Sequence, residues 1–169
     1  EKERRRPLVK RQLAVILAGI SILTVGISTP VSAEEYEPAG YHVYDVQEEE
    51  ATDTWYGIAR GDYLQAGIAK VKKGTKTGYA RASGTTLAHF ACDRLYVRIY
   101  LDESANGTDG WGTLNYWTAN GYNESMVTVS SGDYKITKGD YYRVKGAHSV
   151  FQDDIIETTT TCTDAIPIN

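Results

Sequence analysis

Two stretches of the sequence alternate aromatic or cationic side chains with apolar ones. In residues 94–102, RLYVRIYLD, aliphatic residues occupy every second position, and the positions between them are mostly aromatic or basic; residues 141–151, YYRVKGAHSVF, show a similar alternation. Aromatic rings stack on sugars or on extended peptides and arginine adds hydrogen bonds, so the pattern favours a binding surface. The alternative is cross-strand pairing that only stabilises a sheet. We predict a ligand-binding face made of five residues: Tyr96, Arg98, Tyr100, Tyr141 and Arg143.

Catalytic groups are harder to assemble from this sequence. A nucleophilic triad brings Ser or Cys together with a His and an acid, but the only histidines are His42, His89 and His148, and no serine stands in a nucleophile-elbow sequence. We therefore predict no catalytic residue. The alternative is a small secreted hydrolase that uses two carboxylates at strand ends, with five candidates: Asp93, Asp102, Asp140, Asp153 and Glu157.

Three short motifs of recognition or metal-binding type are incomplete or carry little information. The His and Cys residues at positions 89, 92, 148 and 162 are zinc ligands by type, but they lack the paired CxxC spacing of a strong site. Residues 102–113 place oxygen ligands around Gly107, as in a calcium loop, but Thr113 stands where a bidentate Glu is needed. The tripeptide Arg60-Gly61-Asp62 matches an integrin motif and is typical of a turn. We predict no metal and no cofactor.

The first 33 residues have the order of a secretory leader. A basic segment at 1–12 precedes an uncharged apolar run at 13–25, and small residues at 31–33 offer a cleavage site after Ala33. An uncleaved membrane anchor is the alternative; it requires about 20 apolar residues, and Pro30 interrupts that length. We expect cleavage, export from the cell, and contact with a membrane only through the leader.

The two cysteines of the chain, Cys92 and Cys162, both follow the leader. An even number of cysteines in an exported protein favours a disulfide. The sequence therefore predicts a Cys92–Cys162 bond, with two buried free thiols as the alternative.

The remainder of the chain predicts an all-β fold. From residue 55 it consists of short alternating runs bounded by Gly, Asn, Asp and Ser, with no 3.6-residue apolar period. This spacing predicts a single antiparallel β-sandwich or small barrel of about seven or eight strands, preceded by a signal-peptide helix. We divide the chain into a signal peptide at 1–33, an acidic flexible lead-in at 34–54 and a β domain at 55–169.

The net charge of the mature chain argues against two classes of partner. The sequence has 18 basic and 22 acidic residues, and its first 33 residues hold six and two of them. This leaves 12 basic and 20 acidic residues, a net charge of −8. Nucleic acids and anionic membrane surfaces attract basic proteins, so neither is expected as a partner.

Several segments together resemble an uncharacterised family of small secreted proteins of Gram-positive bacteria, a domain of unknown function. They span residues 60–166 and comprise RGDYL at 60–64, SGTT at 83–86, CDRL at 92–95, IYL at 99–101, YYRVKGAHSV at 141–150 and ETTTTCT at 157–163. The resemblance implies secretion and an all-β domain, and it transfers no catalytic residue.

These observations predict a secreted β domain that acts by binding. The expected ligand is a glycan or a protein at the cell surface or in the extracellular medium. Two other classes stay open: the hydrolase that uses strand-end carboxylates, and a secreted antimicrobial or toxin-like protein.

Overall fold

The structure is a computed structural model that describes residues 35–58 and 63–169. The signal-peptide prediction and the Arg60-Gly61-Asp62 tripeptide lie outside these residues. No helix of the described part is long and apolar enough to cross a membrane. The described part forms strands: β1 (Glu35–Tyr36), β2 (Gly40–Val46), β3 (Glu50–Gly57), β4 (Leu64–Lys73), β5 (Tyr79–Cys92), β6 (Arg94–Ser104), β7 (Gly112–Gly121), β8 (Glu124–Ser130), β9 (Tyr134–Lys135), β10 (Tyr141–Gln152), β11 (Ile155–Cys162) and β12 (Ile166–Pro167).

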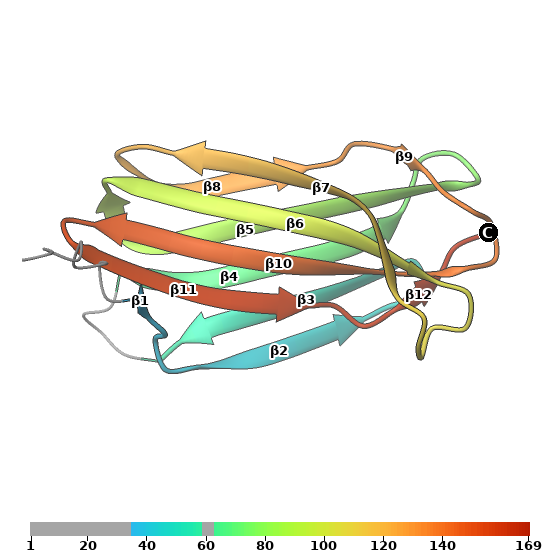
Figure 1. Ribbon diagram of the computed structural model, residues 1–169, viewed down its shortest axis with the longest axis horizontal. Coiled ribbons are helices and arrows are strands. Elements are labelled where there is room, and N and C mark those ends of the chain that lie inside the picture. The colour runs from blue at the N-terminus through green and yellow to red at the C-terminus, as the bar shows by residue number, and fades with distance from the viewer. Residues whose placement is uncertain (1–34, 59–62) are drawn as a thin grey trace, which may run out of the picture. The chain divides into compact units, whose positions relative to one another are not determined.

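The strands form two sheets that pack face to face (Figure 1). The order in the first, which we call sheet I, is β1-β11-β10-β6-β7, with β12 pairing β10; in sheet II it is β2-β3-β4-β5-β8, with β9 pairing β5. All pairs are antiparallel except the short parallel pair of β1 and β11. The predicted antiparallel sandwich is confirmed.

The acidic segment at 34–54 contributes strands rather than a flexible lead-in. Residues 40–46 and 50–57 pair with each other as β2 and β3, and β3 continues into β4. The side chains of β2 are exposed on both faces, so the segment lacks the apolar alternation that identifies a strand in sequence. Pairing with β3, and not burial of its own side chains, holds β2 in the sheet.

The core lies between the two sheets, and the alternation of β6 is confirmed there. Leu95, Val97, Ile99 and Leu101 are fully buried, which contributes roughly 1.5–3 kcal/mol for each large aliphatic side chain. The facing strand β5 supplies small residues: a Cβ atom added at Gly84 would lie only 2.4 Å from Cγ2 of Ile99. The large side chains of β6 therefore fit the core only because the facing residue of β5 is a glycine.

One histidine is buried inside this core as a neutral, hydrogen-bonded residue. The Thr86 hydroxyl donates to the Tyr96 carbonyl at 2.9 Å and lies 3.0 Å from Nδ1 of His148, so Nδ1–H donates to it. The Thr161 hydroxyl then donates to Nε2 at 2.9 Å. Burial lowers the pKa of His148 to about 3 because the interior disfavours the cation. His148 is a structural residue that joins β10 to β5 and β11.

Candidate functional site

Strands β6 and β10 are direct neighbours in sheet I, so their outward side chains share one face. Tyr100 lies opposite Lys145, and Asp102 lies opposite Arg143. Figure 1 looks onto this face, with β6, β10 and β11 in front of β4 and β5. The alternation seen in the sequence therefore produces a single outer surface, as the predicted site requires.

Three of the five predicted residues meet in the middle of this surface. The Arg98 guanidinium lies 5.7 Å from the ring centre of Tyr96 and 5.3 Å from that of Tyr116 on β7, and its Nη1 donates to the Tyr100 hydroxyl at 3.4 Å. The rings of Tyr100 and Tyr116 are 6.1 Å apart. We call Tyr96, Arg98, Tyr100 and Tyr116 the tyrosine platform.

The other two predicted residues lie toward the 104–112 loop. The Arg143 guanidinium lies 4.0 Å from the ring centre of Trp111. A Cβ atom added at Gly107 would lie 2.8 Å from Cδ1 of Tyr141, so the Tyr141 ring packs closely on this loop. Tyr141 therefore supports the loop, whereas Arg143 and Trp111 form a second cation–aromatic pair on the outer face.

A buried carboxylate at a β-bulge connects the two groups. The register of β6 with β7 shifts between Leu101 and Asp102, and Asp102 is buried although it neighbours the outer face. Its carboxylate accepts hydrogen bonds from Arg143 Nε and Nη2, both at 3.3 Å, and from the Thr113 hydroxyl at 2.6 Å. Lys145 Nζ lies 3.0 Å away. Asp102 thus orients both cations of β10.

Two adjoining hollows mark the part of this face that can enclose a ligand. One has a volume of about 390 Å³ and the other about 400 Å³, and Tyr44 and Cys162 line both. We call the pair the outer-face groove. Its aromatic and cationic lining consists of Tyr44, Tyr100, Trp111, Arg143 and Lys145.

One wall of the groove comes from sheet II, through a buried acid on β3. The carboxylate of Asp53 accepts the main-chain N–H of Cys162 at 2.7 Å, and both of its oxygens lie 2.9 Å from Nδ1 of His42. The His42 ring stacks on Tyr44, with ring centres 5.8 Å apart and planes 12° from parallel. Asp53 therefore positions the β2 wall beside β11. The prediction of a flexible segment at residues 34–54 did not include this wall.

The predicted disulfide is absent, and Cys92 and Cys162 are free thiols. Cys162 pairs with Lys145, which lies opposite Tyr100, whereas Cys92 ends β5 next to the start of β6 at Arg94. Six residues of β6 between Arg94 and Tyr100 correspond to roughly 20 Å at about 3.3 Å per residue. A disulfide requires Cα atoms within about 7 Å. The even number of cysteines, on which the disulfide prediction rested, does not indicate how far apart the two residues lie in the fold.

The two thiols also differ in their surroundings. Cys92 is buried in the core, whereas Cys162 is half-buried and lines the groove near the His42–Asp53 pair. Burial raises the pKa of both thiols, and for Cys162 the nearby Arg143 opposes part of that effect. Their ordinary state is therefore the protonated thiol, which is a poor nucleophile.

The strand-end acids serve structural hydrogen bonds. Asp93 accepts the main-chain N–H of Asp153 at 2.9 Å. Glu157 is buried and accepts the main-chain N–H of Leu64 at 2.6 Å, which connects β11 to β4. Asp102 is held by the two cations of β10. These contacts give Asp93, Glu157 and Asp102 a role in the fold.

The metal motifs do not assemble either. Among residues 35–58 and 63–169, no group of three or more His, Cys, Asp or Glu side chains could hold a metal ion. In the 104–112 loop, the Asn106 carboxamide oxygen accepts the main-chain N–H groups of Thr108 and Asp109, and its Nδ2 donates to Asp109 at 2.6 Å. The oxygens of the calcium-like motif thus stabilise the loop itself.

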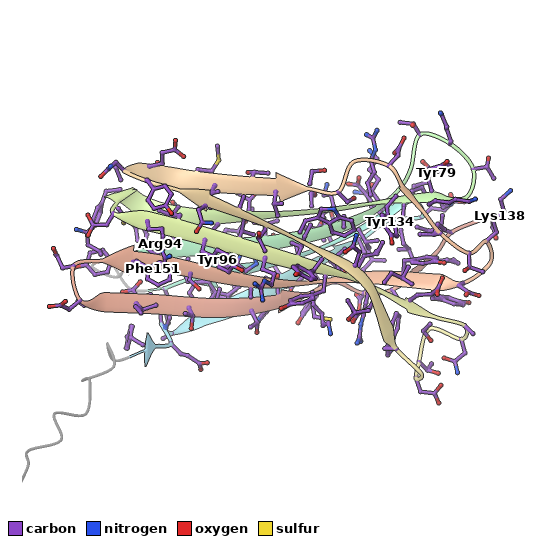
Figure 2. All side chains as sticks on the ribbon, turned by 45° about the horizontal axis from the view of Figure 1, so that its top comes forward. Tyr79, Arg94, Tyr96, Tyr134, Lys138 and Phe151 are labelled. Carbon is purple, nitrogen blue, oxygen red and sulfur yellow. The ribbon has the colours of Figure 1, made fainter. Side chains whose placement is uncertain are left out.

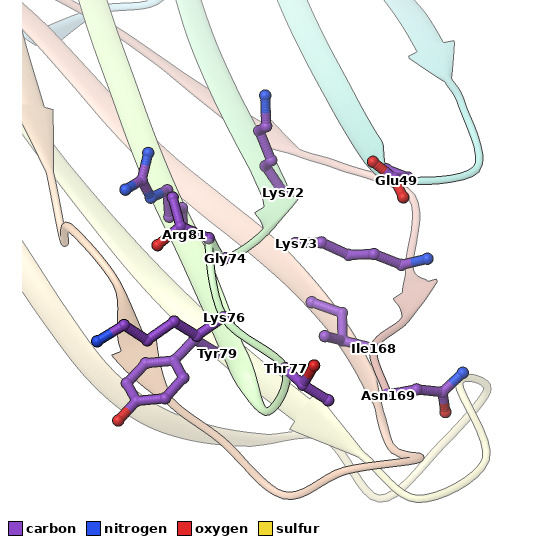
Figure 3. Close-up of a pocket in the computed structure, with 11 residues that line it drawn as sticks. Glu49, Lys72, Lys73, Gly74, Lys76, Thr77, Tyr79, Arg81, Ile168 and Asn169 are labelled. Carbon is purple, nitrogen blue, oxygen red and sulfur yellow. The ribbon is translucent and has the colours of Figure 1, made fainter.

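A further hollow of about 400 Å³ lies at the β4–β5 turn and is rich in lysine (Figure 3). Its cations are partly neutralised, because Lys72 lies 3.7 Å from Glu50 and Arg81 lies 2.5 Å from Asp133. In Figure 3 the side chains of Lys72, Lys73 and Lys76 point in different directions. This hollow therefore lacks the convergent groups of the outer-face groove.

The architecture places the protein among all-β sandwich domains, with an aromatic and cationic groove on one outer face. The chain belongs to a family of unknown function, DUF6147, which matches residues 31–166. No curated protein and no solved structure matches the chain.

Proposed function

We propose that the protein is a secreted, non-catalytic β-sandwich domain that binds a glycan on the outer face of sheet I. The observation that carries this proposal is the pair of adjoining hollows: Tyr100 and Lys145 line one, Trp111 and Arg143 line the other, and Tyr44 lines both. Rings expose flat apolar faces to sugar C–H groups, and the two cations donate hydrogen bonds to hydroxyl oxygens.

The dimensions and rigidity of the groove support a sugar ligand. Its two hollows have volumes within the range of small-molecule sites, about 300–1,000 Å³. Its floor consists of paired strands, and the Asp102 carboxylate holds the cations of β10 in place before a ligand arrives. Preorganised groups lose little entropy on binding, which favours affinity for a weakly hydrophobic ligand.

Export belongs to the same proposal. The order of basic, apolar and small residues in positions 1–33 supports a cleaved leader, and a glycan ligand is consistent with action at a Gram-positive cell surface or in the medium. Mass spectrometry of the culture supernatant should identify a chain that begins at Glu34. Recovery of the protein only with cells, with residues 13–25 retained, would contradict export.

The binding proposal is tested with the protein that starts at Glu34, on a glycan array followed by calorimetry. Trp111→Ala and Tyr100→Ala should each weaken glycan binding by roughly two- to tenfold, since loss of a stacked ring removes on the order of 0.5–1.5 kcal/mol. The matched control is Tyr122→Ala, because Tyr122 is 62% exposed in the β7–β8 turn and does not line the groove. Absence of glycan binding, or equal binding by all three variants, would contradict the proposal.

A further inference from the structure

The charges on the outer face of sheet I have the opposite sign to the charge of the chain. Arg94, Arg98, Arg143 and Lys145 extend from the outward positions of β6 and β10, and Asp102 pairs with two of them. These five side chains sum to +3, or to +1 with Asp53 and Asp164, which line the adjoining hollows, whereas the chain from residue 34 onward carries −8. An acidic protein that concentrates cations on one face attracts anions to that face.

Three of the four cations already have a partner. Arg143 and Lys145 share the Asp102 carboxylate. The Arg94 guanidinium covers the Phe151 ring at 3.7 Å, and Figure 2 shows these two side chains together at one end of the face. These contacts explain Arg94, Arg143 and Lys145 as residues that stabilise the fold.

Arg98 differs from the other three. Within the described residues Arg98, like Arg94, makes no ion pair, but the Nε of Arg98 alone is a buried side-chain nitrogen without a hydrogen-bond partner. Its Nη1 donates a long hydrogen bond to the Tyr100 hydroxyl, while the rings of Tyr96 and Tyr116 hold the guanidinium in position. A positioned guanidinium with uncompensated charge is a ready receptor for a planar anion.

We infer that the ligand of this face is an acidic glycan, and that Arg98 binds a carboxylate carried on its sugar ring. This inference rests on the proposed glycan function and specifies the ligand class. The guanidinium fork matches a carboxylate with two parallel N–H···O bonds, and the flanking tyrosine rings are placed to stack on the sugar that carries it. Lys145, which lies 5.7 Å from the Tyr100 ring centre, adds positive charge at the junction with the groove.

The experiment compares matched probes that differ only in charge. The probes are oligogalacturonate, hyaluronan oligosaccharides and sialyllactose, each beside its carboxyl-reduced counterpart, with a sulfated oligosaccharide as a separate arm. At least one carboxylated probe should bind about tenfold more tightly than its reduced counterpart, as expected for a charge-assisted hydrogen bond. Its affinity should fall as salt rises, because the interaction is between charges near the surface.

Variants of Arg98 test whether this residue causes the preference for the carboxylated probe. Arg98→Gln should abolish the preference, so that the variant binds the carboxylated and reduced probes with equal affinity, and Arg98→Lys should retain only part of the preference. Lys76→Gln, a cation of the β4–β5 turn, is the matched control for the loss of one charge. Melting temperatures of all variants show whether the tyrosine platform still folds.

The possible outcomes distinguish failure of the acidic-glycan inference from failure of the proposed glycan-binding function. Equal affinity for carboxylated and reduced probes, or binding of neutral glycans only, overturns the inference and leaves glycan binding in place. Preference for the sulfated probe through Arg98 overturns the carboxylate assignment. Absence of binding to any glycan, charged or neutral, overturns the proposed function itself.

Discussion

The carboxylate of Asp53 accepts the main-chain N–H of Cys162 at 2.7 Å, which joins β3 of sheet II to β11 of sheet I across 109 residues of sequence. The same carboxylate binds Nδ1 of His42. A single buried acid therefore fixes the relation between β3, β2 and β11, and with it the wall of the outer-face groove.

We expect Asp53→Asn to lower the free energy of unfolding by about 1–3 kcal/mol, because an amide cannot accept hydrogen bonds through both of its terminal atoms. Urea unfolding at pH 7 measures this loss. Asp45→Asn, an exposed substitution on β2, is the control and should leave stability nearly unchanged. If Asp53→Asn is as stable as the wild type, the carboxylate does not hold the two sheets together.

Stability should fall on mild acidification because of His148. Its pKa is about 3 in the folded protein and 6.5 when unperturbed, so below pH 6.5 the unfolded chain binds a proton that the folded chain does not. The free energy of unfolding therefore decreases as pH falls from 6.5 toward 3, by at most about 1.4 kcal/mol per pH unit from this residue. The groups in contact with the ring, Thr86, Thr161 and Gly67, do not ionise.

Urea unfolding of wild type and His148→Gln at pH 5.0, 5.5, 6.0 and 6.5 isolates this contribution. His148→Gln should be less stable at pH 6.5 and show a shallower pH slope, because the variant lacks the titrating group. Identical slopes would mean that other groups produce the acid sensitivity. The slope remains informative even if the variant is much less stable.

The close approach of β5 to β6 predicts a pair of coupled substitutions. Gly84→Ala should destabilise the protein by about 1–3 kcal/mol, since its Cβ would lie 2.4 Å from Ile99 Cγ2. Ile99→Ala should cost about 2–5 kcal/mol through the cavity that it leaves. In the double variant, the new methyl group occupies part of that cavity, so its loss should be smaller than the two single losses combined. Strict additivity in denaturant unfolding would contradict this contact.

The two cysteines should react as free thiols at different rates. Unreduced, unfolded protein should titrate with two thiols. In the folded protein, iodoacetamide followed by peptide mass spectrometry should find Cys162 modified well before Cys92, because Cys162 lines the groove and Cys92 is 1% exposed. A glycan in the groove should slow alkylation of Cys162 and leave Cys92 unaffected. Equal rates for the two cysteines would place Cys162 outside the accessible groove.

The sequence by itself determined the local features of this protein. The period of two in residues 94–102 and 141–151 assigned Leu95, Val97 and Ile99 to the core and Tyr96, Arg98 and Tyr100 to the outer face, because strand side chains alternate whatever their partners are. The all-β class followed from the same alternation and from the turn residues between runs. These properties depend on neighbours in sequence, so no tertiary contact was needed to predict them.

Tertiary structure decided which distant residues meet. Trp111 reaches Arg143 and Asp53 reaches Cys162 only because β-pairing brings remote strands together, and neither contact has a local signal. Pairing also made strands of residues 40–46 and 50–57, which lacked an apolar pattern, and it placed Cys92 far from Cys162. Strand order and register arise from long-range packing of one face against another, which the period of a single strand does not encode.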